Sequence, residues 1–179
     1  YGSPLFRDHV PEKDNAMVAR VRKAGAVILA KPNVPEFGAG ANSRNVVWGA
    51  TGNPFDPKLN AGGSSGGSAV ALATDMLPVC TGSDTGGSLR IPAAVNGVVG
   101  FRPSPGLVPN GKQTRGWANI SVLGPMGRTV AETCQLLGVQ AGPPVGVLEL
   151  APQTVHAFAG EAEAGVAQRG LDRLRTLRR

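Results

Sequence analysis

Two stretches of small residues constrain this chain more than any other feature. Residues 62–68 read Gly-Gly-Ser-Ser-Gly-Gly-Ser, and residues 84–90 read Asp-Thr-Gly-Gly-Ser-Leu-Arg. The first stretch leads directly into residues 68–75, a small apolar segment without Gly or Pro, which predicts a buried helix. A Gly/Ser tract is most often a flexible linker. The hydrophobic helix expected immediately after it disfavours a linker here.

The flanking sequence predicts an α/β architecture. Residues 12–24 repeat apolar side chains at helical spacing, and residues 26–30 form an apolar run that predicts a short buried strand. A helix that feeds such a strand is typical of an α/β layer. The other expected elements are a strand over 76–81 and a helix over 130–137 behind a capping box of Thr129 and Glu132. Residues 31–63 are expected to be mostly irregular, and residues 91–111 are expected to be irregular throughout.

Charge and composition exclude several classes of protein. The net charge is +6, but residues 169–179 hold five Arg and one Asp, so the excess is concentrated in one solvated tail. No apolar run reaches membrane-spanning length, and no secretory leader is visible. We therefore expect no nucleic-acid partner and no membrane, with the cytoplasm as the default location. Cys80 and Cys134 are predicted to be buried free thiols, and no Cys/His spacing suggests a metal site.

Two further kinds of site place glycines before a helix. A phosphate loop holds its anion on bare N–H groups, but the Lys-Ser/Thr pair of the P-loop is missing here. Residues 62–66 also match the Gly-x-Ser-x-Gly nucleophile elbow, which requires a downstream His that only His156 supplies. The phosphate loop and the nucleophile elbow would each explain residues 62–68 but not residues 84–90.

Taken together, the two stretches favour serine-based acyl transfer. A serine that attacks an acyl carbon needs a base, a proton route and N–H donors for the developing oxyanion. Ser88 is the candidate nucleophile, and Ser64 is placed on the other glycine-rich loop to relay a proton. The candidate oxyanion donors are the backbone N–H groups of Thr85, Gly86, Gly87 and Ser88.

The two stretches belong to a longer pattern that resembles the amidase signature family. The pattern continues in family order through 24–33, 49–56, 62–68, 82–106 and 124–130. The resemblance covers residues 1–142 and implies the core of an α/β fold, a mixed twisted β-sheet flanked by helices. Residues 143–179 show no match and are expected to form a helical or disordered tail.

The resemblance implies an amidase that cleaves a small-molecule amide with a Ser-Ser-Lys triad and without a metal or organic cofactor. Ser88 would be the nucleophile, and Ser64 would be the bridging serine on a peptide bond that the family holds cis. Ser65, Asp84 and Arg90 match family positions that support the loops.

The third triad member has no match in this chain. The family places its catalytic Lys upstream of the Gly/Ser loop in a Lys-Asp motif, and Lys13, Lys23, Lys31 and Lys58 do not match that position. We therefore expect a truncated amidase with low or no activity. Sheet edges left open by truncation would favour homodimers.

Two alternatives remain open at this point. A glutamyl-tRNA amidotransferase A subunit has the same fold, but it usually carries Gln between the nucleophile and the following Pro, where this chain reads Leu89-Arg90-Ile91-Pro92. A non-catalytic remnant that serves as a binding or scaffolding piece would also lack the lysine. Restoring an upstream Lys would separate the remnant from the enzyme.

Overall fold

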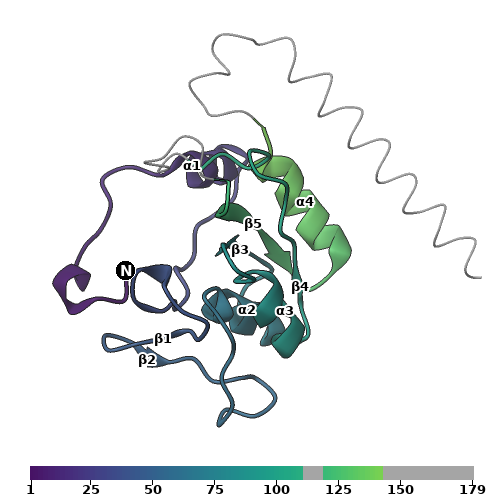
Figure 1. Ribbon diagram of the computed structural model, residues 1–179. Coiled ribbons are helices and arrows are strands. Elements are labelled where there is room, and N and C mark those ends of the chain that lie inside the picture. Colours follow the sequence, from purple (N-terminus) through teal and green to yellow (C-terminus); the bar gives the residue numbers. More distant parts are fainter. Residues whose placement is uncertain (111–118, 143–179) are drawn as a thin grey trace, which may run out of the picture.

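A computed structural model describes residues 1–110 and 119–142, and a three-stranded antiparallel sheet lies at its centre. The strands follow the order β3 (Val79–Asp84), β5 (Val122–Gly127) and β4 (Val99–Gly100). Four helices accompany the sheet within the described residues: α1 (Ala16–Lys23), α2 (Gly66–Ala73), α3 (Arg90–Asn96) and α4 (Val130–Gln140). Figure 1 shows β3 and β5 between α4 on one side and α2 and α3 on the other.

Each face of the sheet buries its own hydrophobic cluster. Cys80 of β3 packs with Leu72 and Met126 beneath α2 and α3, whereas its neighbour Val79 packs against the cluster of α1 and α4. The two side chains separate because successive residues of a strand point to opposite faces. This layering confirms the α/β fold class expected from the sequence.

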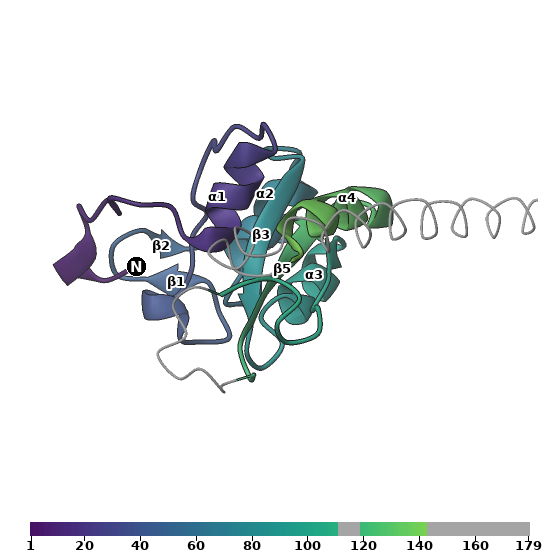
Figure 2. The ribbon, with the colours of Figure 1, turned by 90° about the horizontal axis from the view of Figure 1, so that it is seen from above.

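A less regular lobe lies beside the sheet. It contains 3₁₀ turns at Pro4–Phe6 and Glu36–Gly38 and a two-stranded hairpin of β1 (Arg44–Asn45) and β2 (Gly49–Ala50). Figure 2 shows this lobe and α4 at opposite ends of the described structure. The mostly irregular chain expected over 31–63 is confirmed.

Local signals place the helix ends. Asn15 caps α1 by accepting the Val18 N–H at 2.9 Å, so the helix begins inside the predicted range 12–24. Thr129 and Glu132 form the predicted capping box of α4, with Glu132 N–H to Thr129 Oγ1 at 3.2 Å. The helix runs on to Gln140, past the expected end at 137.

The strand expected over 26–30 is wrong. The segment belongs to no strand, and Val27 and Leu29 are 78% and 69% exposed. An apolar run becomes a strand only where a neighbouring strand satisfies its backbone N–H and C=O groups, and the described residues place none beside it. The expected strand over 76–81 is present but shifted, because β3 runs from Val79 to Asp84.

Two further expectations need correction. Residues 91–111 are not wholly irregular, because α3 spans Arg90–Asn96 with Pro92 in its first turn, where the missing N–H costs nothing. Of the two cysteines, only Cys80 is buried, and burial raises the pKa of its thiol to about 11. Cys134 is exposed on α4. The tail proposed for 143–179, including His156, lies outside the described residues.

Gly67 of α2 provides a test of how closely this helix packs. A Cβ at Gly67 would stand 2.4 Å from the carbonyl oxygen of Asn33, whose side chain is itself held by Thr51 Oγ1 at 3.1 Å. We expect Gly67→Ala to destabilise the fold by about 1–3 kcal/mol, measured by urea unfolding. Gly138→Ala in α4 is the control, since nothing lies within 4 Å of its Cβ position. Equal unfolding midpoints for both variants would contradict this packing.

Candidate active site

The two glycine-rich stretches form adjacent turns at the amino-terminal ends of α2 and α3. The first turn precedes α2, and the second joins β3 to α3. The Ser65 N–H donates to the Ser88 carbonyl at 3.2 Å, so the two turns are in direct contact. The peptide bond between Gly63 and Ser64 is cis, as the resemblance implies.

Ser88 lies half-buried at an open pocket of about 500 Å³. Both turns line the pocket, which is closed on its other side by the loop 37–41. The contributing residues of the turns and α3 are Gly63, Thr85, Gly86, Ser88 and Ile91. Sequence reasoning missed the loop 37–41, because its residues Phe-Gly-Ala-Gly-Ala carry no reactive group.

Ser64 is buried, with 4% of its surface exposed. Its carbonyl accepts the Ser43 hydroxyl at 3.0 Å, and Ser43 Oγ accepts the Gly66 N–H at 2.8 Å. Ser43 thereby fixes the backbone on both sides of Ser65, a role that the sequence did not indicate. The hydroxyl groups of Ser64 and Ser88 make no hydrogen bond to another described residue, so both remain available for chemistry.

Two more serines attach α2 to β3. Ser65 Oγ accepts the Ser83 N–H at 3.3 Å and donates to the Ser83 carbonyl at 3.4 Å. Ser68 lies inside α2, and its hydroxyl donates to the Thr81 carbonyl at 3.0 Å. These bonds attach the first glycine-rich turn and the start of α2 to β3, the strand that leads to the second glycine-rich turn.

Asp84 organises the turn that carries Ser88. Its carboxylate is fully buried and accepts the backbone N–H groups of Gly87 at 2.8 Å and Leu89 at 3.2 Å. Arg90 Nε donates to it at 2.9 Å, and Arg102 Nη1 donates at 2.9 Å. Asp84 and Arg90 therefore belong to a hydrogen-bond network that supports the turn. Arg102 is a further member of this network, which the sequence analysis did not identify.

The charge of Asp84 is stable in this setting. Burial alone would raise the pKa of the carboxyl, but the hydrogen bonds from Arg90, Gly87, Leu89 and Arg102 lower it well below its ordinary value. The group therefore stays ionised at neutral and mildly acidic pH. At these pH values the ionised carboxylate holds the turn around Ser88.

The N–H of Gly87 differs from the expected arrangement. It donates to Asp84 at 2.8 Å, so it does not face the pocket as an oxyanion donor. Thr85 and Gly86 are exposed and line the pocket with Ser88, and the N–H groups of these three residues have no acceptor among the described residues. Three N–H groups, rather than the four expected from the sequence, are therefore candidate oxyanion donors.

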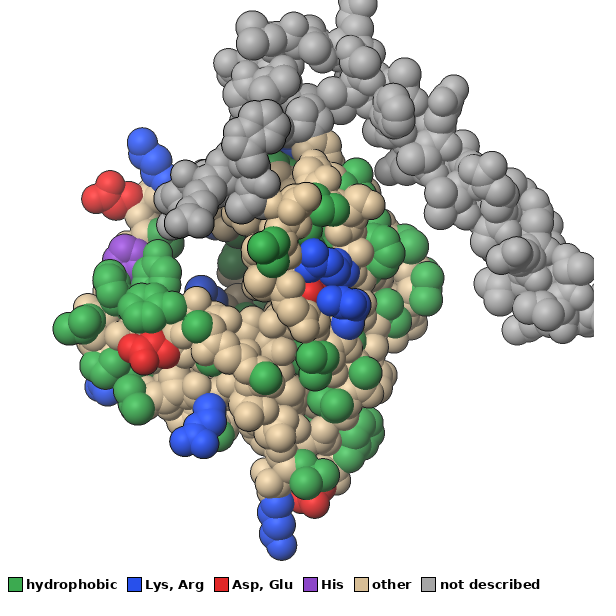
Figure 3. All heavy atoms as spheres, viewed as in Figure 1, with side chains coloured by type: hydrophobic (Ala, Val, Ile, Leu, Met, Phe, Trp, Pro, Cys, Tyr) green, Lys and Arg blue, Asp and Glu red, His purple; other side chains and the backbone are tan. Residues whose placement is uncertain are grey.

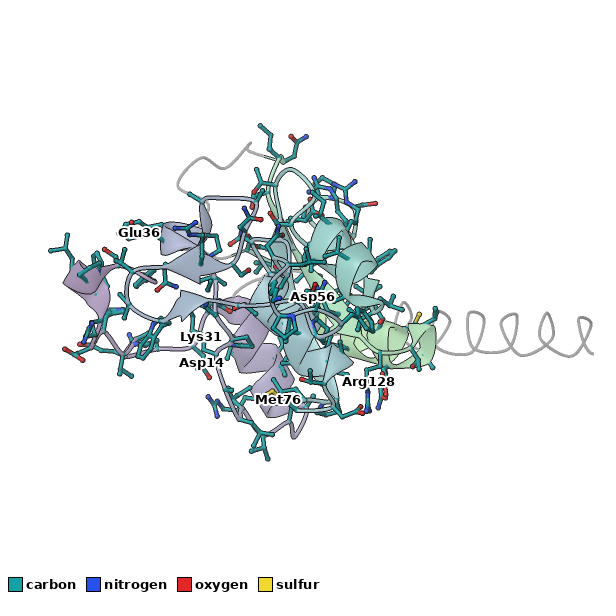
Figure 4. All side chains as sticks on the ribbon, turned by 90° about the horizontal axis from the view of Figure 1, so that it is seen from below. Asp14, Lys31, Glu36, Asp56, Met76 and Arg128 are labelled. Carbon is teal, nitrogen blue, oxygen red and sulfur yellow. The ribbon has the colours of Figure 1, made fainter. Side chains whose placement is uncertain are left out.

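Neither a lysine nor a metal cluster lies at this site within the described residues. The described lysines Lys13, Lys23, Lys31 and Lys58 are not among the pocket residues, and Lys31 is labelled in Figure 4. No group of three His, Cys, Asp or Glu side chains could hold a metal ion in the parts 1–110 and 119–142. None of the described helices is long and apolar enough to cross a membrane.

Comparison with known proteins agrees with this geometry. The family model for amidases matches residues 1–164. The chain is 42% identical over 162 residues to the A subunit of the glutamyl-tRNA(Gln) amidotransferase of Thermus thermophilus, covering 89% of this chain and 34% of that relative. The chain belongs to the amidase signature family.

Solved structures give the same result. The A subunit of the glutamyl-tRNA(Gln) amidotransferase of Thermotoga maritima superposes with a TM-score of 0.76 at 34% identity, covering 80% of this chain and 32% of that one. A 6-aminohexanoate cyclic dimer hydrolase solved with its substrate gives a TM-score of 0.74 at 38% identity, covering 78% of this chain and 30% of that one. The chain thus spans about a third of the length of these relatives.

Proposed function

We propose that this chain carries the nucleophile of an enzyme that hydrolyses carboxylic amides through an acyl-enzyme on Ser88. The observation that carries the proposal is the position of Ser88 at an open pocket, beside unpaired N–H groups of Thr85 and Gly86, on a turn fixed by the buried Asp84. Membership of the amidase signature family supports the same chemistry.

Each group of the site has a defined role in this reaction. Ser88 Oγ attacks the amide carbon, its proton passes through the Ser64 hydroxyl, and the amine leaves with a proton as the C–N bond breaks. The N–H groups at Thr85, Gly86 and Ser88 stabilise the oxyanion, and loss of one such donor typically costs about a hundredfold or more in rate. Water then hydrolyses the ester. The base that drives the relay is not assigned to a residue of this chain.

A second candidate function is favoured by the curated relatives. Several are A subunits of glutamyl-tRNA(Gln) amidotransferases that share about two fifths of their residues with this chain over the matched region, among them that of Natronomonas pharaonis at 44% over 141 residues. Such a protein would work with partner subunits. The two candidates differ in the amide that reaches Ser88, so ammonia release from glutamine, compared with aniline release from an anilide, separates them.

The acyl-enzyme provides the direct test. We expect the folded chain, incubated with p-nitrophenyl butyrate in imidazole buffer, to gain one butyryl group on the peptide that contains Ser88. The activated ester needs no protonation of its leaving group, and imidazole supplies an external base. Butyrylation confined to other residues of the folded chain, with Ser88 unmodified, would contradict the proposal.

A further inference from the structure

A cluster of aromatic rings adjoins the candidate active site. Tyr1, Phe6, His9 and Phe37 come from two segments that are far apart in sequence. The ring centroids of Tyr1 and Phe6 are 5.1 Å apart, those of Tyr1 and His9 are 5.2 Å apart, and those of Phe6 and Phe37 are 5.7 Å apart. These separations are typical of edge-to-face and tilted aromatic pairs. We call these four residues the aromatic cluster.

Phe37 belongs to both the aromatic cluster and the pocket. It is one of the residues that line the pocket of Ser88, and its N–H donates to the Tyr1 carbonyl at 2.8 Å. Its backbone has a φ of +54°, a left-handed conformation that costs a non-glycine residue conformational energy and often marks binding sites. Phe37 therefore connects the pocket of Ser88 to the aromatic cluster.

The wall from Phe37 toward Ser88 is built from small residues. Gly38, Ala39, Gly40 and Ala41 follow Phe37 around the pocket, and Ile91 faces them from α3. Because these residues lack long side chains, they leave the pocket open between Ser88 and Phe37. No charged side chain lines this pocket within the described residues.

The rings are accessible rather than sealed in a core. Tyr1, Phe6 and Phe37 are 43%, 39% and 58% exposed, and none of them belongs to the two buried hydrophobic clusters of the sheet. Figure 3 shows hydrophobic side chains gathered beside the histidine on the left of the molecule. Exposed apolar patches next to a reactive pocket are typical of ligand-binding surfaces.

We propose that the aromatic cluster is an extended substrate subsite, which binds an aryl or long apolar arm of the amide whose carbonyl reaches Ser88. This inference rests on the proposed function of Ser88. It names apolar amides as the substrate class, and it disfavours glutamine, because the polar and charged groups of glutamine would lose their hydration against these rings.

Fluorophosphonate probes test the subsite separately from the nucleophile. The probes are a small diethyl reagent and two phenylbutyl reagents, which carry the ring either on the phosphorus–carbon side or on the alkoxy side. We expect at least one phenylbutyl probe to modify Ser88 about tenfold faster than the diethyl probe, as measured by intact mass over time.

Three variants locate the origin of that preference. Phe6→Leu and Phe37→Ala should reduce it to about threefold or less, because each removes one ring from the cluster. Phe55→Ala is the matched control, since Phe55 is 76% exposed and outside the cluster. Circular dichroism confirms that each variant is folded.

The outcomes separate the two proposals. Equal rates with all probes, or a preference that survives both cluster variants, overturn the subsite while leaving Ser88 as nucleophile. Failure of every probe to modify Ser88 in the folded chain overturns the proposed function itself.

Discussion

Ser88→Ala should reduce the release of p-nitrophenol from an activated ester to the buffer rate. In serine hydrolases, loss of the nucleophile typically costs on the order of 10⁴- to 10⁶-fold in rate, because no neighbouring group can form the acyl-enzyme. The unfolding midpoint should stay close to that of the parent chain, since the Ser88 hydroxyl makes no hydrogen bond to another described residue. Stopped-flow absorbance and urea unfolding measure the two quantities.

Two further serine variants make this result specific. Ser104→Ala changes an exposed serine outside the pocket and should leave the rate unchanged. Ser64→Ala keeps the nucleophile but removes the proposed relay, so we expect an intermediate loss of about 10²–10⁴-fold. A rate in Ser88→Ala equal to that of Ser104→Ala would show that the ester reacts elsewhere.

Among the variants proposed here, Asp84→Ala should cause the largest decrease in the free energy of unfolding. The substitution removes a fully buried carboxylate and leaves the N–H groups of Gly87 and Leu89 and the Arg102 guanidinium without their partner. Breaking a buried charge pair typically costs about 3–5 kcal/mol. Urea unfolding measures the effect, and Asp14→Ala, which removes a partly exposed ion pair with Arg22, should leave the midpoint almost unchanged. Similar midpoints for Asp84→Ala and Asp14→Ala would contradict the role of Asp84.

The dependence of unfolding free energy on pH in the acidic range provides an independent check on the role of Asp84. Because the folded pKa of Asp84 lies below its unfolded value, its ionised form stabilises the fold above the unfolded pKa of about 4. That contribution is lost as the pH falls from this value toward the folded pKa. We expect Asp84→Asn to flatten the decline in unfolding free energy over this range. An unchanged slope in Asp84→Asn would assign the acid sensitivity to other groups.

The sequence predicted most strongly what depends on local pattern. The capping box of Thr129 and Glu132 needs only neighbouring residues, and so does the helix behind the glycine-rich turn at residues 62–65. The placement of Ser64 and Ser88 on adjacent turns came from two motifs read together. The layered α/β fold was predicted from the family resemblance. Such a resemblance implies how distant segments are arranged, whereas hydrophobic periodicity indicates only single helices and strands.

The remaining features depend on contacts between distant residues. Arg102 reaches Asp84 from beyond α3, and Ser43 reaches the Ser64 carbonyl from a loop with no recognisable motif. The strand expected over 26–30 failed for the same reason, because pairing requires a neighbour that composition does not reveal. Whether Gly87 donates to the pocket or to Asp84 is equally invisible in a run of glycines, and the structure assigns it to Asp84.

One measurement tests the central claim most directly: the intact mass of the chain and of Ser88→Ala after incubation with a small fluorophosphonate. We predict one phosphonyl adduct on the parent chain, located on the peptide that contains Ser88, and no adduct on the variant. Such a result would place a reactive serine and its oxyanion donors on the turn held by Asp84. A folded parent chain without an adduct, or an adduct that persists in Ser88→Ala, would contradict the assignment of Ser88 as the nucleophile.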